Sequence, residues 1–573
     1  MLLGGEEVAG PLVLLPQAEA LKESSRAART ATRGRNQVGR DSPLNAPPAR
    51  TPRVYVHGLA DGRDEAPVRR LAGRWRSTRA AAFVQAFNGR AMPDGGWRER
   101  FPRSLRLPLA ISIAVVTLVA IAVRVPLFGT PFTAPDSGYY LALGRGVFHG
   151  GGYASNLRPP AYPTLLAIFE LLGADPAHAA VVFQDLIGMV FPAFVLLAGW
   201  RFFSPFVGLT AGFLTAASPL MIAIEQFVLT DYLFSVVLFI AVVILAEAVL
   251  RLRSGTSAWT LLIAAGAMFG LATLLRANGI YGLVGIPAVL LLAVPRWKPA
   301  LRASAIAAAA LVVVIAPWCI HNLLRFGDPN VTSEGGLSLY SRAISYDQVP
   351  PSADTASGRL ALGIYNTADP EKQEAVVGTT SYVLNALVKE RGQDLIEATN
   401  TMGGLATKAI LAEPGTYLRD SLQILGRYQG AYYPRTLTGN TNADQISLAT
   451  EYLQTLDRSK RELADDSILT RGPWRIAQAI TQLLFIFTIG GLLLVALPFL
   501  GSQRSRLAGT TFLTIGILGI LGVTLTARFE LRHGIVFAPL IWILAPAAVS
   551  VAGRFIFALL PSLPRPRTRH ATT

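Results

Sequence analysis

The sequence contains little cysteine, little histidine and few acidic residues. Its single cysteine, Cys319, excludes an internal disulfide and any metal cluster held by cysteines. Lysine and arginine number 52 against 36 acidic residues, which leaves a formal net charge of +16. We expect no nucleic-acid partner, because the basic residues gather in the tails and in short loops between apolar runs, where membrane topology places them.

Long apolar runs dominate the chain: 51% of its residues are hydrophobic and its mean hydropathy is +0.42. Runs of about 18 residues or more are typical of membrane-spanning helices, so we predict an all-α polytopic protein in a lipid bilayer. About ten spans are expected, near residues 107–128, 178–200, 204–223, 231–250, 258–275, 279–295, 302–318, 473–499, 508–526 and 534–552. The apolar run 162–173 is too short to cross and predicts an interfacial or re-entrant helix.

Composition divides the chain into five regions. Residues 1–104 are basic and lack apolar periodicity, which predicts a disordered tail, an over-extended gene start or an arm that binds anionic lipid. A transmembrane module at 105–318 is followed by a large polar loop domain at 319–472, expected to be mixed or mainly helical. Further spans at 473–553 and a basic tail at 554–573 complete the chain, and no internal repeat is evident.

The distribution of charge predicts the topology. Arg100, Arg103 and Arg106 precede the first span, so its N-terminus should be cytoplasmic, and ten spans then place both termini in the cytoplasm of a plasma (inner) membrane. The expected cytoplasmic loops are basic and contain no acid; they carry Arg201, Arg251, Arg253, Arg296, Lys298, Arg302, Arg504 and Arg506. The acids Asp136, Glu225, Asp231 and Glu530 fall on the other face.

Three of these outer acids are the candidate catalytic carboxylates: Asp136, Asp231 and Glu225. A carboxylate at the edge of a membrane is costly unless it is hydrated, paired or catalytic. Both aspartates precede apolar runs, so a purely structural role as a helix cap is equally open for each. Their occurrence in two short loops on one face favours a shared site.

The outer loops also contain more arginine than the positive-inside tendency allows. Guanidinium groups match phosphate oxygens in a fork, although some of these arginines must pair with the acids. The predicted donor-phosphate residues are Arg158, Arg276, Arg325, Arg528, Arg532 and His533; Arg145 is a further outer arginine. Tyr139, Tyr140 and Tyr162 could contact a sugar or an acceptor.

One reaction uses these groups beside a bilayer. A carboxylate deprotonates an acceptor hydroxyl, which attacks the anomeric carbon of a lipid-linked sugar, and the lipid phosphate leaves as an anion that arginines stabilise. This reaction inverts the anomeric carbon. The alternative is a transporter or flippase for a charged lipid-linked sugar, which needs polar residues at mid-membrane depth; the spans near 204–223, 258–275 and 302–318 have almost none.

The residues around these groups resemble the GT-C superfamily of integral-membrane glycosyltransferases. Within it, the chain is most similar to the protein O-mannosyltransferase and lipid A aminoarabinose transferase-like group (glycosyltransferase family 39-like), from about Leu107 to Leu544. The resemblance is carried by Asp136 with Tyr139-Tyr140, Arg158-Pro159-Pro160-Ala161-Tyr162-Pro163, Leu229-Thr230-Asp231, and Ala316-Pro317-Trp318-Cys319-Ile320-His321-Asn322.

This resemblance implies a polyprenyl-phosphate sugar donor, an extracytoplasmic active site, and Asp136 as the base or the acid that positions the acceptor. The acceptor would be a cell-envelope glycan, a lipid or a protein. Ser137 follows Asp136 where many relatives have Glu, so that role is missing or passes to Glu225. His321 replaces the usual Arg, which shifts any phosphate contact there toward Arg325. No cofactor is implied with certainty; a divalent metal held by His321, His533 and Asp136 is an open alternative, although two distant histidines are a poor metal signal.

Overall fold

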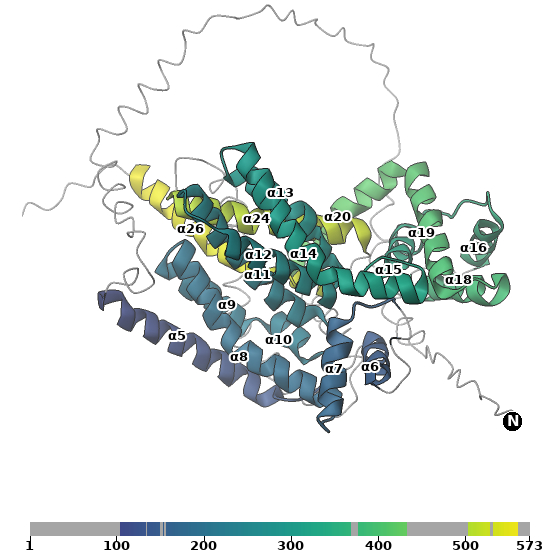
Figure 1. The fold of residues 1–573 in the computed structure, drawn as a ribbon, viewed down its shortest axis with the longest axis horizontal. Coiled ribbons are helices and arrows are strands. Elements are labelled where there is room, and N and C mark those ends of the chain that lie inside the picture. Colours follow the sequence, from purple (N-terminus) through teal and green to yellow (C-terminus); the bar gives the residue numbers. More distant parts are fainter. Residues whose placement is uncertain are drawn as a thin grey trace, which may run out of the picture.

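A computed structural model describes residues 103–132, 135–148, 153, 156–367, 376–432, 502–527 and 531–559. Within these ranges the chain is helical, and its β-structure is limited to one isolated parallel bridge between Phe132 and Phe227. Residues 1–102 of the predicted tail 1–104 and the predicted span 473–499 lie outside the described residues. Figure 1 shows long helices lying side by side, with a group of shorter helices, α15 to α19, at the right-hand end.

The long helices are those expected from the apolar runs. They are α5 (Arg103–Arg124), α8 (Pro176–Phe202), α9 (Pro205–Ala217), α11 (Asp231–Arg253), α12 (Trp259–Leu275), α13 (Gly282–Ala293), α14 (Trp297–Phe326), α24 (Gln503–Thr526) and α26 (Ala538–Leu559). Within the described residues, five helical segments are long and apolar enough to cross a membrane, and the shorter apolar helices include α9, α12 and α13. The all-α polytopic prediction is therefore confirmed, and the count of ten spans stays a prediction.

The predicted span at 204–223 is broken into two helices, α9 and α10 (Pro219–Gln226). The break occurs at Ser218, whose hydroxyl accepts a hydrogen bond from the Met221 amide (3.3 Å) and so caps α10. Pro219 follows and has no N–H to continue the α9 ladder, which makes a helix start favourable at this position. The break directs Glu225 and Gln226 toward α8 rather than into an outer loop.

Helix α14 is longer than the predicted span at both ends. Its 30 residues correspond to about 45 Å at 1.5 Å per residue, more than the thickness of a bilayer core of about 30 Å. It continues past the expected boundary at 318 to Phe326, and it ends at Gly327, whose φ of 71° suits a left-handed C-cap. His321 and Arg325 consequently lie on a helix rather than in a loop.

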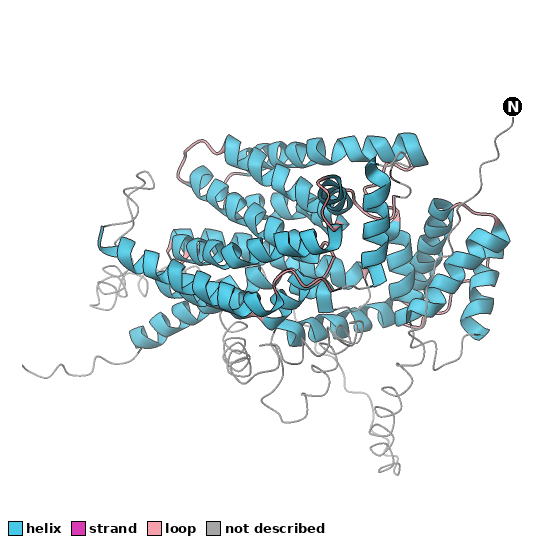
Figure 2. Ribbon diagram, turned by 90° about the horizontal axis from the view of Figure 1, so that it is seen from below, coloured by secondary structure: helices cyan, strands magenta, loops and turns pink. Residues whose placement is uncertain are grey.

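The two ends of the bundle carry different ion pairs. At one end, Arg201 at the end of α8 pairs with Glu247 near the end of α11 (2.9 Å). Asp231, at the start of α11, pairs instead with Arg276 at the other end. This alternation agrees with the predicted up-and-down course of the chain, and Figure 2 shows the long helices lying roughly parallel.

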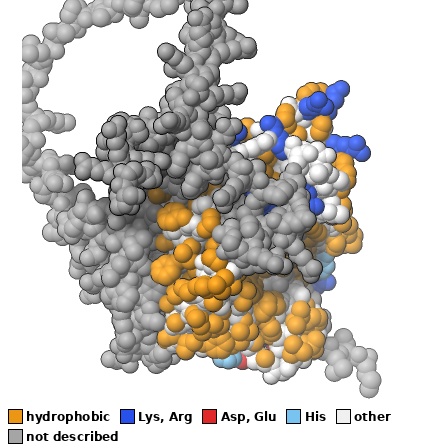
Figure 3. All heavy atoms as spheres, turned by 90° about the vertical axis from the view of Figure 1, so that its left-hand side faces the viewer, with side chains coloured by type: hydrophobic (Ala, Val, Ile, Leu, Met, Phe, Trp, Pro, Cys, Tyr) orange, Lys and Arg blue, Asp and Glu red, His pale blue; other side chains and the backbone are white. Residues whose placement is uncertain are grey.

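Apolar side chains are exposed on the outside of the bundle. Leu118, Val284, Leu292 and Val313 are 63–70% exposed. On the face shown in Figure 3, apolar side chains form a broad area, and Lys and Arg side chains gather toward one edge. Such a surface suits contact with lipid, because exposed apolar area of this extent is unfavourable in water.

The polar segment after α14 folds into a group of helices with its own core. These are α15 (Glu334–Tyr340), a π-helical turn η3 (Ser341–Tyr346), α16 (Ala356–Thr367), α18 (Val376–Arg391), α19 (Leu395–Ala412) and α20 (Pro414–Tyr432). Helix α20 contributes Ile424 to the core of the bundle. The other helices share a separate core that includes Tyr340, Ile344, Leu387, Met402 and Leu405. Gly392, with a φ of 64°, separates α18 from α19. The described part of this domain is thus helical, as expected.

Two short helices complete the fold: α6 (Pro135–Phe148) and α7 (Ala161–Leu171). Both lie near the end of the bundle that faces the loop domain (Figure 1). Helix α7 is the short apolar helix predicted at 162–173, and its position relative to a membrane stays a prediction.

Candidate active site

Asp136 lies between two arginines that are distant in the sequence. It sits in the first turn of α6, where its Oδ1 accepts a hydrogen bond from Nη2 of Arg158 (3.1 Å). Its Oδ2 accepts one from Nη2 of Arg532 (2.8 Å), which belongs to α25 (Leu531–Ile535). The structure therefore brings the predicted first outer loop and the predicted last outer turn together around one carboxylate that is 29% exposed.

Arg158 is held in place by the start of the loop domain. Its guanidinium pairs with Glu334, the first residue of α15, as well as with Asp136. The residues before Arg158 are also held by hydrogen bonds from the loop domain. Thr332 Oγ1 donates to the Leu157 carbonyl oxygen and Ser333 Oγ donates to Asn156 Oδ1, both at 2.7 Å. Burial alone lowers the pKa of Arg158, but Glu334, Tyr140 and Asp136 raise it well above its usual value, so the side chain stays cationic.

Two of the three predicted sugar-contacting tyrosines lie beside Arg158. The Tyr139 and Tyr140 ring centroids lie 5.9 and 5.8 Å from the Arg158 guanidinium carbon, within cation–π range. Tyr140 is 7% exposed and packs edge-on against Tyr162, which is fully buried, at 5.5 Å. Burial raises the pKa of Tyr140. Tyr140 and Tyr162 are therefore not accessible to a sugar in this structure, and Tyr139 is half-buried.

Asp231 and Arg276 form a second acid–arginine pair. Asp231 opens α11 and is 2% exposed, and Arg276 follows the end of α12. Tyr140 lies near the charged groups of Arg158, Asp136 and Arg276, and Tyr162 lies near Asp231. The Arg158–Asp136 pair and the Arg276–Asp231 pair therefore both adjoin the packed tyrosines.

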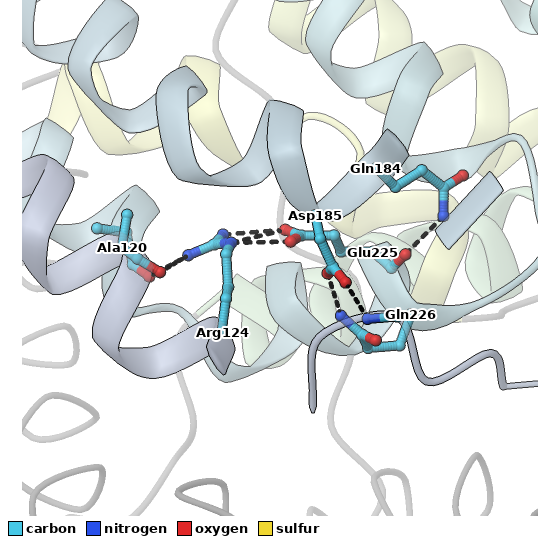
Figure 4. Close-up of polar contacts among 8 residues, drawn as sticks. Ala120, Arg124, Gln184, Asp185, Glu225 and Gln226 are labelled. Atoms are coloured by element: carbon cyan, nitrogen blue, oxygen red, sulfur yellow. Dashed lines mark hydrogen bonds and ion pairs between the residues drawn. The ribbon is translucent and has the colours of Figure 1, made fainter. Parts of the chain in front are cut away.

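Glu225 does not join these pairs. It is fully buried, and its carboxylate accepts hydrogen bonds from Nε (2.8 Å) and Nη2 (2.9 Å) of Arg124 (Figure 4). Asp185 lies beside it and accepts from the Gln226 side chain (2.5 Å). In this state Glu225 has no access to a substrate, so its predicted catalytic role has no support from its position. Arg124 and Asp185 were missed because both lie within predicted spans; an ionisable residue inside an apolar run is the signal that could have identified them.

The remaining predicted residues are dispersed. Arg325 and His321 are exposed on α14, and the His321 ring stacks on Trp318 at 5.0 Å. Arg145 is exposed on α6, and His533 is half-buried next to Arg532. Arg528 and Glu530 lie outside the described residues. In the part of the chain that the structure describes, no group of three or more His, Cys, Asp or Glu side chains could hold a metal ion.

Three of the predicted outer arginines that the structure describes pair with acids. Arg158, Arg276 and Arg532 each contact a carboxylate, whereas Arg145 and Arg325 are exposed to solvent. The cause is their partial burial: the three paired arginines are only 15–16% exposed, and a poorly hydrated cation requires a counter-charge. A guanidinium has five N–H donors, so donors remain for a further anion.

A small apolar hollow lies between α11, α12, α13 and α24, and its volume of about 10 Å³ is enough for about one water molecule. Its lining includes Asn278 and Gly279, from the turn after Arg276, and Phe234, Phe269 and Phe537. Tyr281, which also lines it, is hydrogen-bonded to Thr526 (2.9 Å). In this structure the hollow has no room for a lipid chain.

Comparisons with known proteins give one family match and several distant structural similarities. Residues 157–321 match the family model described as dolichyl-phosphate-mannose-protein mannosyltransferase. No curated protein matches the sequence.

Among solved structures, the chain is similar to the archaeal oligosaccharyltransferase AglB from Archaeoglobus fulgidus, in complex with an inhibitory peptide and a dolichol-phosphate. The identity is 14% and the TM-score 0.41, over 80% of this chain and 54% of AglB, so the chain spans about half the length of that protein. It is also similar to ArnT from Cupriavidus metallidurans bound to undecaprenyl phosphate, with 15% identity and a TM-score of 0.32, over 78% of each chain.

The matched segment includes Arg158, Tyr162, Glu225, Asp231 and Arg276. Over residues 157–321 the chain is therefore similar to the dolichyl-phosphate-mannose-protein mannosyltransferases, which confirms the resemblance to integral-membrane glycosyltransferases that the sequence indicates.

Proposed function

We propose that this chain is an inverting membrane glycosyltransferase that moves a sugar from a polyprenyl-phosphate donor to an extracytoplasmic acceptor. The observation that carries the proposal is Asp136, a part-exposed carboxylate held between Arg158 and Arg532. The family match over residues 157–321 supports the reaction class. The sugar would be a hexose or pentose, and the acceptor a cell-envelope glycan, a lipid or a protein.

In the proposed reaction, Asp136 accepts the proton of an acceptor hydroxyl. The hydroxyl oxygen forms a bond to the anomeric carbon from the side opposite the phosphate. The bond between that carbon and the phosphate oxygen breaks, and the polyprenyl phosphate leaves with the electron pair. Stabilising a phosphate that is already a good anion replaces a general acid, which is why a second carboxylic acid is not required.

Arg532 and Arg276 are the arginines best placed to stabilise the leaving phosphate. Arg532 contacts Asp136 directly, so a phosphate bound by its guanidinium would lie close to the base. Arg276 pairs with Asp231, so a phosphate bound there would lie close to the second proposed acid. Arg158 holds Asp136 and Glu334 together and shapes the acceptor side.

A transferase fits the bundle better than a transporter. Transport of a charged headgroup requires polar residues along a path through the membrane. Helices α12 and α13 contain no charged residue. Arg124 and Asp185, which lie within predicted spans, are enclosed in one buried cluster with Glu225 and do not form a path across the bundle.

The proposal includes the orientation of the protein. We place the Asp136 end of the bundle outside a plasma membrane and both termini in the cytoplasm, because Arg201, Arg251 and Arg253 gather at the opposite end. The division into a transmembrane module at 105–318, a loop domain at 319–472 and C-terminal helices at 473–553, between basic tails, is part of the same proposal. Accessibility of single cysteines introduced near Arg145 and Arg253 to an impermeant thiol reagent would test it.

The experiment that tests the function compares cell-envelope glycans and lipids by mass spectrometry. The native host would be examined with its own copy, without it, and with the Asp136→Asn variant restored at equal expression. We expect one glycan or lipid to lose one sugar in the deletion strain and to remain short of it in the variant strain. Envelopes that are the same in all three strains would contradict the proposal.

A further inference from the structure

We infer that Arg124, Asp185 and Glu225 form a buried positioning network that fixes Asp136 and Asp231 relative to each other. The inference rests on the proposed function, since it assumes that these two acids act in transfer. None of the three network residues would contact the substrate.

The network joins three helices (Figure 4). Arg124, the last residue of α5, binds the Glu225 carboxylate through two nitrogens and donates to the Ala120 and Ala216 carbonyl oxygens at 3.2 and 3.0 Å. Asp185 of α8 lies within hydrogen-bonding reach of Glu225 of α10.

The surrounding structure encloses Arg124, Asp185 and Glu225 and leaves room for their side chains. The Arg124 and Glu225 side chains are 1% and 0% exposed, and Asp185 is fully buried. Gly188 on α8 makes room for the Glu225 carboxyl group, because a Cβ at this position would overlap its atoms. Buried ion pairs add little stability compared with apolar side chains of the same size, so stability alone is a weak reason to have one.

The network reaches the two acids through two chain segments. Asp185 accepts hydrogen bonds from the Gly129 amide (2.7 Å) and from the Gln226 side chain (2.5 Å). Gly129 has a φ of 69°, and a Cβ there would lie 2.8 Å from the His178 ring, so the backbone turns here in a way that glycine allows. Asp185 thus anchors the chain after α5 to the chain after α10.

These two segments then pair with each other. The Phe132 amide donates to the Gln226 carbonyl oxygen (2.8 Å), and the Val228 amide donates to that of Phe132 (3.1 Å). Phe132 and Phe227 form the parallel bridge, and each precedes one of the acids, Asp136 or Asp231, by four residues. One buried network therefore sets the starting point of both segments that carry the proposed catalytic acids.

The test replaces the ion pair by apolar side chains of similar size, in Arg124→Met/Glu225→Leu. A matched control is Arg201→Met/Glu247→Leu, which removes the ion pair at the other end of the bundle. Transfer from undecaprenyl-phosphate [³H]mannose to membranes of the deletion strain would be measured, together with the melting temperature. We expect kcat to fall about 100-fold, as for a displacement of about 1 Å at a reacting group. KM for the donor should change less than twofold, and the melting temperature and the control should match the wild type.

A second readout does not depend on activity. Amide hydrogen exchange at Phe132 and Val228 should become at least tenfold faster in the double variant and stay unchanged in the control. Unchanged exchange, or a kcat within threefold of the wild type in a folded variant, would overturn the inference and leave the proposed function intact. Cell-envelope glycans and lipids that are the same with and without the wild-type protein, while the exchange rates respond as expected, would overturn the proposed function alone.

Discussion

Asp136→Asn removes one negative charge and leaves the size and shape of the side chain almost unchanged. In the structure this charge faces Nη2 of Arg158 at 3.1 Å and Nη2 of Arg532 at 2.8 Å. Part-exposed ion pairs contribute about 0.2–1 kcal/mol each, so the variant should lose no more than about 2 kcal/mol of a typical 5–15 kcal/mol. The protein should therefore fold and insert normally.

The effect on transfer should be much larger than the effect on stability. An amide cannot take the proton of the acceptor hydroxyl, and a positioned general base contributes about 10²–10⁴-fold to a rate. This corresponds to a barrier higher by about 3–5 kcal/mol at 1.36 kcal/mol per tenfold change. We expect kcat to fall by at least 100-fold.

The assay measures transfer from undecaprenyl-phosphate [³H]mannose to membranes of the deletion strain, with the protein in lipid nanodiscs. The control is Asp354→Asn, which removes the same kind of charge from an exposed ion pair with Lys408 in the loop domain. It should leave transfer and melting temperature unchanged. A folded Asp136→Asn protein with more than a tenth of wild-type kcat would refute Asp136 as the base.

Three further predictions follow from other contacts. Arg532→Gln removes one partner of Asp136 and, in the proposed reaction, one contact to the donor phosphate. The value of kcat/KM for the donor should fall about 10–100-fold, at about 1.4 kcal/mol per tenfold. Arg145→Gln, at an exposed position, is the control. Gly188→Ala forces a methyl group against the Glu225 carboxyl group and should destabilise the protein by about 1–3 kcal/mol. Scanning fluorimetry in detergent would detect the lower melting temperature, and an unchanged melting temperature would contradict this packing. Burial, opposed by Arg342, raises the pKa of Asp347 from 3.8 to about 6. Between these two values the folded state binds a proton that the unfolded state has released. The free energy of unfolding should therefore fall by up to about 3 kcal/mol as the pH rises from 4 to 7. Asp347→Asn should remove this dependence, and equal pH profiles for the two proteins would count against a buried Asp347.

The apolar runs and the charge pattern were sufficient to predict the membrane bundle and to place Asp136, Arg158 and Arg532 at one end of it. Hydropathy predicts spans because a helix must satisfy its backbone inside lipid, and alternation of spans then decides which loops share an end. The pairing of Arg532 with Asp136 was not predictable in detail, since nothing local links residues nearly 400 positions apart.

Other features depend on tertiary contacts that no short motif encodes. Glu225 was assigned to an outer loop, but the cap at Ser218 and the proline after it start a new helix that directs Glu225 toward Arg124. Tyr140 and Tyr162 were expected to face a sugar, and they instead pack against each other. The Ser-Pro pair was a readable signal for the first difference, whereas the second depends on how α6 and α7 meet.

The central claim is that distant outer turns form one anionic-substrate site around Asp136. Its most direct test is an electron cryo-microscopy structure of the Asp136→Asn protein in nanodiscs with undecaprenyl-phosphate mannose. We predict the phosphate on Arg276 or Arg532 and the anomeric carbon facing residue 136. A phosphate bound at the other end of the bundle, beside Arg201 or Arg253, would contradict the account.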